Sequence, residues 1–127
     1  MIIQRHSEEQ IRPDQVRVMA SGLLHLARID GITDSEKGLI ESFLEEGKVD
    51  LDLDRLALIP FTIEGLLAGL DTSFLRKTFL RVAVALAVAD GTVSNEEMGE
   101  LRRLGQALGI DVPIEALVAE VEGKSLE

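Results

Sequence analysis

The stretch that decides the fold is "ALAVADGTVSNEEMGELRRLG", residues 85–105, in which an apolar segment stops at an Asp-Gly pair and continues as an acidic segment. A second stretch, "LARIDGITDSEKGLIESFL" at residues 26–44, has the same order of residue types. In both, a hydroxyl residue precedes a glutamate by three positions, which is the spacing of a capping box at a helix N-terminus. Each stretch is therefore predicted to form a helix, a turn and a second helix.

The two stretches align well beyond the turn, although the second turn is longer by one residue. The aligned pairs include acidic, capping and apolar positions: Leu26 with Leu86, Asp30 with Asp90, Thr33 with Ser94, Glu36 with Glu97, Ile40 with Leu101, and Phe43 with Leu104. A likeness that covers both helices and the turn indicates an internal repeat. We expect two related helix-turn-helix halves, at about residues 13–47 and 73–109.

Caps and apolar periodicity predict helices over most of the chain. The first expected helix begins at about Pro13, and the second runs from Thr33 to Gly47. Two short helices are expected around Pro60. Three further helices are expected over Ser73 to Ala89, Ser94 to Gly109, and Pro113 to about Val121. The segment from Ser73 to Ala89 is rich in Ala and Leu and too long for a typical strand, so it is expected to be a helix. Because it is apolar almost all round from Val82 onward, it is also expected to be the most buried element. The predicted fold is all-α, a compact helical bundle in one domain over residues 1–127.

Composition supports one domain with an aliphatic core. The chain has 127 residues, of which 46% are hydrophobic, but it has no Trp or Tyr and only 4 Phe. This length is enough to bury one core without disulfides or structural zinc. The absence of Cys excludes disulfides, thiolate metal sites and cysteine nucleophiles, and it fits a reducing compartment, so a cytoplasmic location is expected.

Charge and motif content narrow the function further. Asp and Glu number 23 against 13 Lys and Arg, and the formal net charge of −10 repels nucleic acids and anionic lipid surfaces. The apolar run from Val82 to Ala89 is too short to insert through a membrane, so a soluble protein is expected. The chain also lacks a nucleophile elbow and a phosphate-binding glycine loop, and no enzyme activity is predicted.

Asp30 and Asp90 each follow a predicted helix, where free carbonyls and the helix dipole disfavour a carboxylate. In one interpretation these residues turn toward the amides of the next helix, while Glu36 and Glu97 complete capping boxes. In the other, the repeat brings the two turns together and their carboxylates hold a hard divalent cation. Neighbouring features have simpler interpretations: Asp50, Asp52 and Asp54 form a solvated edge with a helix cap, and His25 is a partly exposed side chain rather than a ligand.

The motifs "ARIDGITDSEKGLIESFL" and "ALAVADGTVSNEEMGELRRLGQALGI" resemble those of the tellurite-resistance TerB family and its TerB-like relatives, which include a domain of a membrane-anchored DnaJ-type co-chaperone. The resemblance covers about residues 13–122. It implies a divalent-cation site, for calcium or magnesium, and a role in metal-ion or stress response through membrane-associated partner proteins. The positions that the resemblance assigns to the metal are Asp30, Glu36, Asp90 and Glu97.

Two functions from different classes follow. One is a TerB-like metal-binding module acting in tellurite resistance or stress response; the other is a metal-free acidic helical adaptor that docks a partner protein, as a co-chaperone does. Convergent carboxylates favour the first function. Dispersed carboxylates, together with an exposed apolar patch near Phe61 and Leu66, favour the second. Because the first turn is shorter and follows Arg28, Asp90 is expected to matter more than Asp30 for cation binding.

Overall fold

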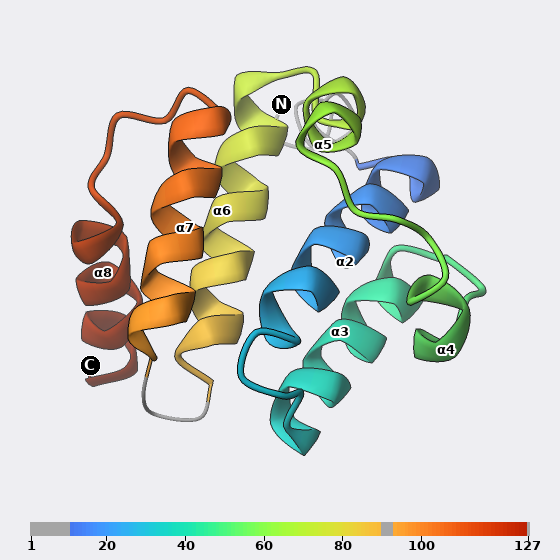
Figure 1. Ribbon diagram of the computed structural model, residues 1–127, viewed down its shortest axis with the longest axis horizontal. Helices are drawn as coiled ribbons and strands as arrows, with labels where there is room; N and C mark the ends of the chain where they lie inside the picture. Colours follow the sequence, from blue (N-terminus) through green and yellow to red (C-terminus); the bar gives the residue numbers. More distant parts are fainter. Residues whose placement is uncertain (1–10, 90–92, 127) are drawn as a thin grey trace, which may run out of the picture.

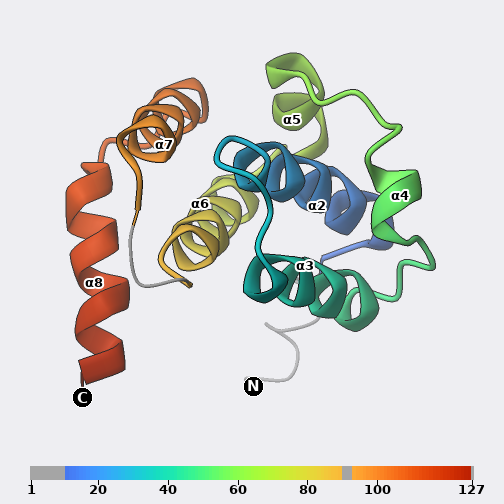
Figure 2. The same cartoon turned by 60° about the horizontal axis from the view of Figure 1, so that its bottom comes forward.

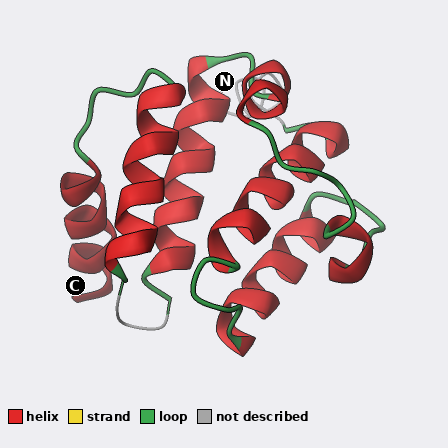
Figure 3. Ribbon diagram, in the orientation of Figure 1, coloured by secondary structure: helices red, strands yellow, loops and turns green. Residues whose placement is uncertain are grey.

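The computed structural model describes residues 11–89 and 93–126, and these residues form helices without any strand (Figures 1 and 3). In chain order the helices are α2 (Pro13–Ala27), α3 (Asp34–Glu46), α4 (Leu53–Leu56), α5 (Ile63–Gly69), α6 (Ser73–Ala87), α7 (Asn95–Ala107) and α8 (Ile114–Leu126). The prediction of an all-α bundle is confirmed. Within the described ranges, no helix combines the length and the apolar character that crossing a membrane requires.

The two long helix pairs have matching dimensions. Helices α2 and α6 each have 15 residues, and α3 and α7 each have 13. Both α2 and α6 run toward the same end of the bundle (Figure 1), and in the sequence an Asp-Gly pair follows each of them, of which the structure describes only Asp30-Gly31. A common origin of the two halves stays a prediction, because equal lengths are compatible with a repeat and do not require one.

Side-chain caps fix the helix starts that the sequence predicts. The Thr33 hydroxyl accepts a hydrogen bond from the Glu36 amide at 3.2 Å, and the Glu36 carboxylate accepts one from the Thr33 amide at 3.0 Å. Ser94 and Glu97 make the same reciprocal pair at 3.0 and 3.3 Å. Asp52 caps α4 by accepting a hydrogen bond of 2.9 Å from a first-turn amide. Both predicted capping boxes and the predicted Asp52 cap are thus confirmed.

The ends of two helices differ in detail from the prediction. Gly47 follows α3 as expected, but its φ is −82°, and it is Lys48 that adopts the left-handed conformation with a φ of 61°. Gly47 is needed for space, because a Cβ there would stand 2.5 Å from Cγ1 of Val16. Helix α8 continues to Leu126, beyond the expected end near Val121.

Helix α2 is the centre of the fold. It contacts α3, α4, α5, α6 and α7, and Figure 2 shows four of these helices arranged around it. Ten of its 15 residues are buried, against seven of 15 in α6. The prediction that the segment from Ser73 to Ala89 is the most buried was therefore wrong. Helix α6 exposes Lys77 and Arg81, and it leaves Val82 and Ala85 half-buried.

Small residues on α2 allow this close packing. A Cβ at Gly22 would stand 2.8 Å from Cζ of Phe79 and 3.3 Å from Cε1 of Phe61, so both rings lie directly on the α2 backbone. Phe79 is fully buried, whereas Phe61 is half-buried. Ala20, Ser21 and Gly22 of α2 are therefore buried without contributing large apolar side chains.

Truncating a leucine in the core should lower the stability of the fold strongly, whereas truncating one on the surface should hardly change it. Leu86 is fully buried and Leu58 is 81% exposed. Leu86→Ala is expected to lower the free energy of unfolding by about 2 to 5 kcal/mol, because it removes buried apolar contacts and leaves a cavity. Leu58→Ala should change it by less than about 0.5 kcal/mol. Urea denaturation measures both, and a loss below about 1 kcal/mol for Leu86→Ala would contradict the placement of the core.

Candidate functional site

The structure describes three of the four residues expected to bind a metal. Glu36 and Glu97 are buried, and each carboxylate accepts a hydrogen bond from the amide of its N-cap residue. Asp30 is exposed and accepts no hydrogen bond from any residue that the structure describes, which argues against a capping role for this side chain. The glutamates therefore have the structural role that the capping interpretation gives them, and Asp30 does not.

The fourth residue, Asp90, lies outside the described residues, so the distance between the Asp30 and Asp90 carboxylates stays untested. Among residues 11–89 and 93–121, whose side chains the structure describes, no three His, Asp or Glu side chains come together in a way that would hold a metal ion. A shared site would thus depend on Asp90. The four-carboxylate site stays a prediction.

A different surface is prominent in the described structure: the loop between α4 and α5, with the sequence "ALIPF" at residues 57–61. Leu58 is 81% exposed and Ile59 is 38% exposed. The exposed patch considered near Phe61 and Leu66 is not found at those two residues, because Leu66 is buried and Phe61 is half-buried. The exposed apolar side chains of this loop are instead those of Leu58 and Ile59.

Two adjoining hollows, of about 310 and 220 Å³, lie beside this loop and share Ser21, Ile59, Pro60 and Phe61. We call them together the α2–loop groove. Its helical wall is formed in part by a polar stripe of four residues, of which Arg17, Ser21 and His25 lie on α2 and Arg28 is the C-cap residue of that helix. Steps of four, four and three residues keep these side chains on one face of a helix. This stripe is visible in the sequence, but the loop that completes the groove comes from a distant segment.

His25 joins the groove to the second half of the bundle. Its ring stacks on Phe61 with a centroid distance of 4.4 Å, and its Nε2 lies 2.7 Å from a Glu100 carboxylate oxygen on α7. Arg103 donates two hydrogen bonds to the same carboxylate, at 2.9 and 2.6 Å. The predicted partial exposure of His25 is correct, and the ring also holds the loop against α2.

The described lining of the groove is basic, although the chain is acidic overall and an adjoining hollow, which shares Arg17 and Ile59 with the groove, is also lined by Asp14 and Asp50. The ionisable residues among its described lining are Arg17, His25 and Arg28, and that lining includes no carboxylate. Both arginines are exposed, and neither forms an ion pair with a residue that the structure describes. Nearby, the Arg103 guanidinium lowers the pKa of Glu100, and the hydrogen bond from His25 lowers it further, although partial burial opposes the shift.

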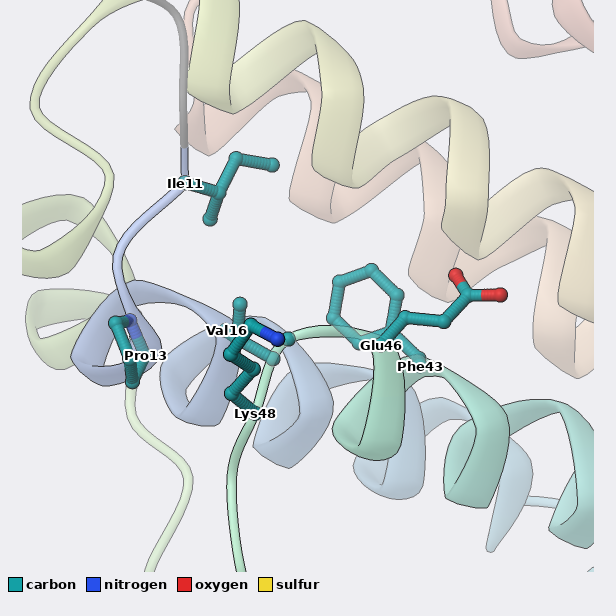
Figure 4. Close-up of a pocket in the computed structure, with 7 residues that line it drawn as sticks. Ile11, Pro13, Val16, Phe43, Glu46 and Lys48 are labelled. Atoms are coloured by element: carbon teal, nitrogen blue, oxygen red, sulfur yellow. The ribbon is translucent and has the colours of Figure 1, made fainter. Parts of the chain in front are cut away.

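Another hollow, of about 340 Å³, lies where the chain enters α2 (Figure 4). Its side chains come from the start of α2, including Val16, and from the end of α3, including Phe43. Glu46 and Lys48 give its lining both signs of charge. Ile11, the first residue that the structure describes, also belongs to this lining. The α2–loop groove is the better-defined site.

Comparisons of the chain with family models, with curated proteins and with solved structures found no match. The resemblance to TerB-like domains therefore depends on the two sequence motifs alone. The function has to be argued from the geometry and charge of the described residues.

The Glu100 ion pair gives an expected pH dependence. Because Glu100 has a lowered pKa in the folded protein, its contribution to stability is complete above the unfolded-state pKa and is lost as the pH falls through the folded-state pKa. For a partly exposed pair this contribution is about 0.5 to 1 kcal/mol. Urea denaturation between pH 7 and pH 3 should show a correspondingly smaller acid-induced loss in Glu100→Gln than in wild type. Glu41→Gln, at an exposed position on α3, is the control and should keep the wild-type slope; equal slopes for all three proteins would contradict the role of Glu100.

Proposed function

We propose that this protein is an acidic helical adaptor that docks a segment of a partner protein in the α2–loop groove. The observation that carries the proposal is the 81% exposure of Leu58, which lies in the chain between the lining residues Ala57 and Ile59 of a groove whose arginines form no ion pair with described residues. Burying a leucine side chain fully contributes about 1.5 to 3 kcal/mol. A partner that covers Leu58 and Ile59 gains this free energy of apolar burial in addition to polar contacts with the α2 stripe.

The loop is held in place before any partner arrives. Leu56 is buried on its N-terminal side, and Phe61 stacks on His25 on its C-terminal side. Pro60 further restricts the backbone between these two anchors. A surface that is already ordered avoids the entropy cost of ordering during association, so a larger share of the contact energy appears as affinity. This supports docking at residues 57–61 rather than folding upon binding.

A hydrolytic site in the same groove has less support. Ser21 and His25 line one hollow, and His25 contacts Glu100, so the residue types match those of a Ser-His-Glu triad. A nucleophile has to be hydrogen-bonded to its base, or within reach of it in a substrate complex. No hydrogen bond joins Ser21 to His25 among the described residues, and Ser21 is buried on α2. The geometry therefore favours docking over catalysis.

The proposed docking can be tested with a displayed library of random peptides selected against the wild-type protein. Selected peptides should lose binding to Leu58→Asp, because the substitution places a charge where an apolar contact is expected. Amide NMR shifts should map to α2 and to residues 57–61. Val112→Asp is the matched control, since Val112 is also an exposed apolar residue but lies between α7 and α8. Peptides that bind Leu58→Asp as well as wild type, or that map elsewhere, would refute the proposal.

Metal binding at the acidic turns is a second candidate function. The observation in its favour is the exposed Asp30 carboxylate, which has no described partner and follows the C-terminus of α2, where a negative charge is unfavourable. A divalent cation shared with Asp90 would offset this charge. With the TerB-like motifs, this supports a role in metal or stress response, in the cytoplasm and with a partner at a membrane.

The metal hypothesis predicts ion-dependent thermal stability. If calcium or magnesium binds the folded protein at Asp30 and Asp90, the melting temperature should rise with ion concentration. Asp90→Asn should abolish the rise, whereas Asp30→Asn should weaken it. In a chelator, both substitutions should be neutral or slightly stabilising, because each removes a carboxylate near the negative end of a helix dipole. Melting curves that are independent of both ions for all three proteins would end the metal hypothesis.

A further inference from the structure

The α2–loop groove has a charge pattern that selects the chemistry of its occupant. We infer that the docked segment is an acidic peptide with an apolar centre, whose carboxylates pair with Arg17 and Arg28 at the two ends of the α2 stripe. The inference rests on the proposed docking function and adds the chemical class of the partner.

The spacing of the two arginines defines the length of the segment. Arg17 on α2 and Arg28, the C-cap residue of α2, are eleven positions apart, which is close to three helical turns, so they lie on the same face. At a rise of 1.5 Å per residue, their Cα atoms are about 16 Å apart along the helix axis. About five residues of an extended chain, or about eleven of a helix, cover that distance. A short linear segment is therefore long enough to reach both guanidinium groups.

The groove between the two arginines is suited to apolar side chains. His25 is occupied by its contacts with Phe61 and Glu100, so its ring presents a fixed surface. On the opposite wall, Ile59 and Pro60 line the hollows and Leu58 stands exposed beside them. A matching segment carries acidic residues at its ends and one or two apolar residues between them.

Neither arginine of the groove forms an ion pair with a described residue, in contrast to four other arginines of the chain. Arg12, Arg81, Arg102 and Arg103 each form an ion pair within the described structure, whereas Arg17 and Arg28 form none with described residues. The guanidinium group binds carboxylates in a bidentate geometry, which adds orientation to attraction. Unlike charges across an interface also increase association rates and exclude wrong partners.

The overall charge argues against a nucleic acid as the occupant. Both an acidic peptide and a phosphate backbone would satisfy two arginines, but the net charge of −10 repels a long polyanion from the rest of the surface. A short segment has little charge outside the groove and meets less of this repulsion. The apolar loop beside the arginines also matches apolar side chains better than phosphates.

The experiment uses peptides from the displayed library that map to the groove, synthesised with a fluorescent label. Their affinities are measured by anisotropy for wild type, for the double variant Arg17→Gln/Arg28→Gln, and for the control Lys37→Gln/Lys77→Gln. Lys37 and Lys77 are exposed on α3 and α6 and are not part of the groove lining. Both double variants change the net charge equally, so only the groove variant tests local pairing.

The selected peptides should be net negative with an apolar centre. Their affinity should fall by about fivefold or more in the arginine variant, as expected for two exposed ion pairs, and by less than about twofold in the lysine variant. Affinity for wild type should also weaken as salt is raised. Groove-mapping peptides that are neutral or basic, or equal losses in both variants, would overturn the acidic-partner inference while leaving docking intact.

Two other experimental outcomes would each reject a different claim. If no selected peptide maps to the groove, the docking function itself fails. If sedimentation shows that the protein self-associates and Leu58→Asp abolishes the association, the occupant is a second copy of the chain, and the inferred separate acidic partner is wrong.

Discussion

The contact between Phe79 of α6 and the backbone of α2 at Gly22 is the constraint on which the rest of the structure depends. A side chain at position 22 would begin 2.8 Å from the Phe79 ring, so the two helices are as close as a helix without a side chain at that point allows. The same glycine gives Phe61 room to lie against α2, at 3.3 Å from the ideal Cβ position. One small residue therefore sets both the packing between the long helices and the position of the α4–α5 loop.

This arrangement explains why the sequence predicted some elements well and others poorly. The capping boxes at Thr33 and Ser94 could be predicted because their hydrogen bonds join residues three positions apart. Burial could not be ranked in this way, because it depends on how many neighbours surround a helix. Helix α6 has the more continuous apolar run, yet α2 is more buried because five helices pack around it.

In the candidate site, too, the features set by residues close in sequence could be predicted, whereas those set by residues far apart in sequence could not. The polar stripe on α2 follows from helical periodicity, and it could have been found by asking which polar residues share a face of a largely apolar helix. Its meaning depends on Phe61 and Glu100, which lie far away in the chain and reach His25 only in the folded bundle. The acidic turns were more conspicuous in the sequence, but the structure assigns Glu36 and Glu97 to helix capping.

The exposure of Leu58 has a geometric cause, and its functional meaning comes from its surroundings. Leu56 and Phe61 are drawn toward the core and α2, so the chain between them has to turn outward and carries Leu58 with it. Geometry alone would allow a polar residue at position 58, because nothing in the core contacts a side chain that is 81% exposed. An apolar residue there is unfavourable in water, and the hollows beside the loop are lined by the arginines of α2 that have no described ion-pair partner. An exposed apolar side chain beside arginines that form no ion pair with described residues matches both features of the inferred partner, an acidic peptide with an apolar centre, and the turn of the loop alone does not account for this combination.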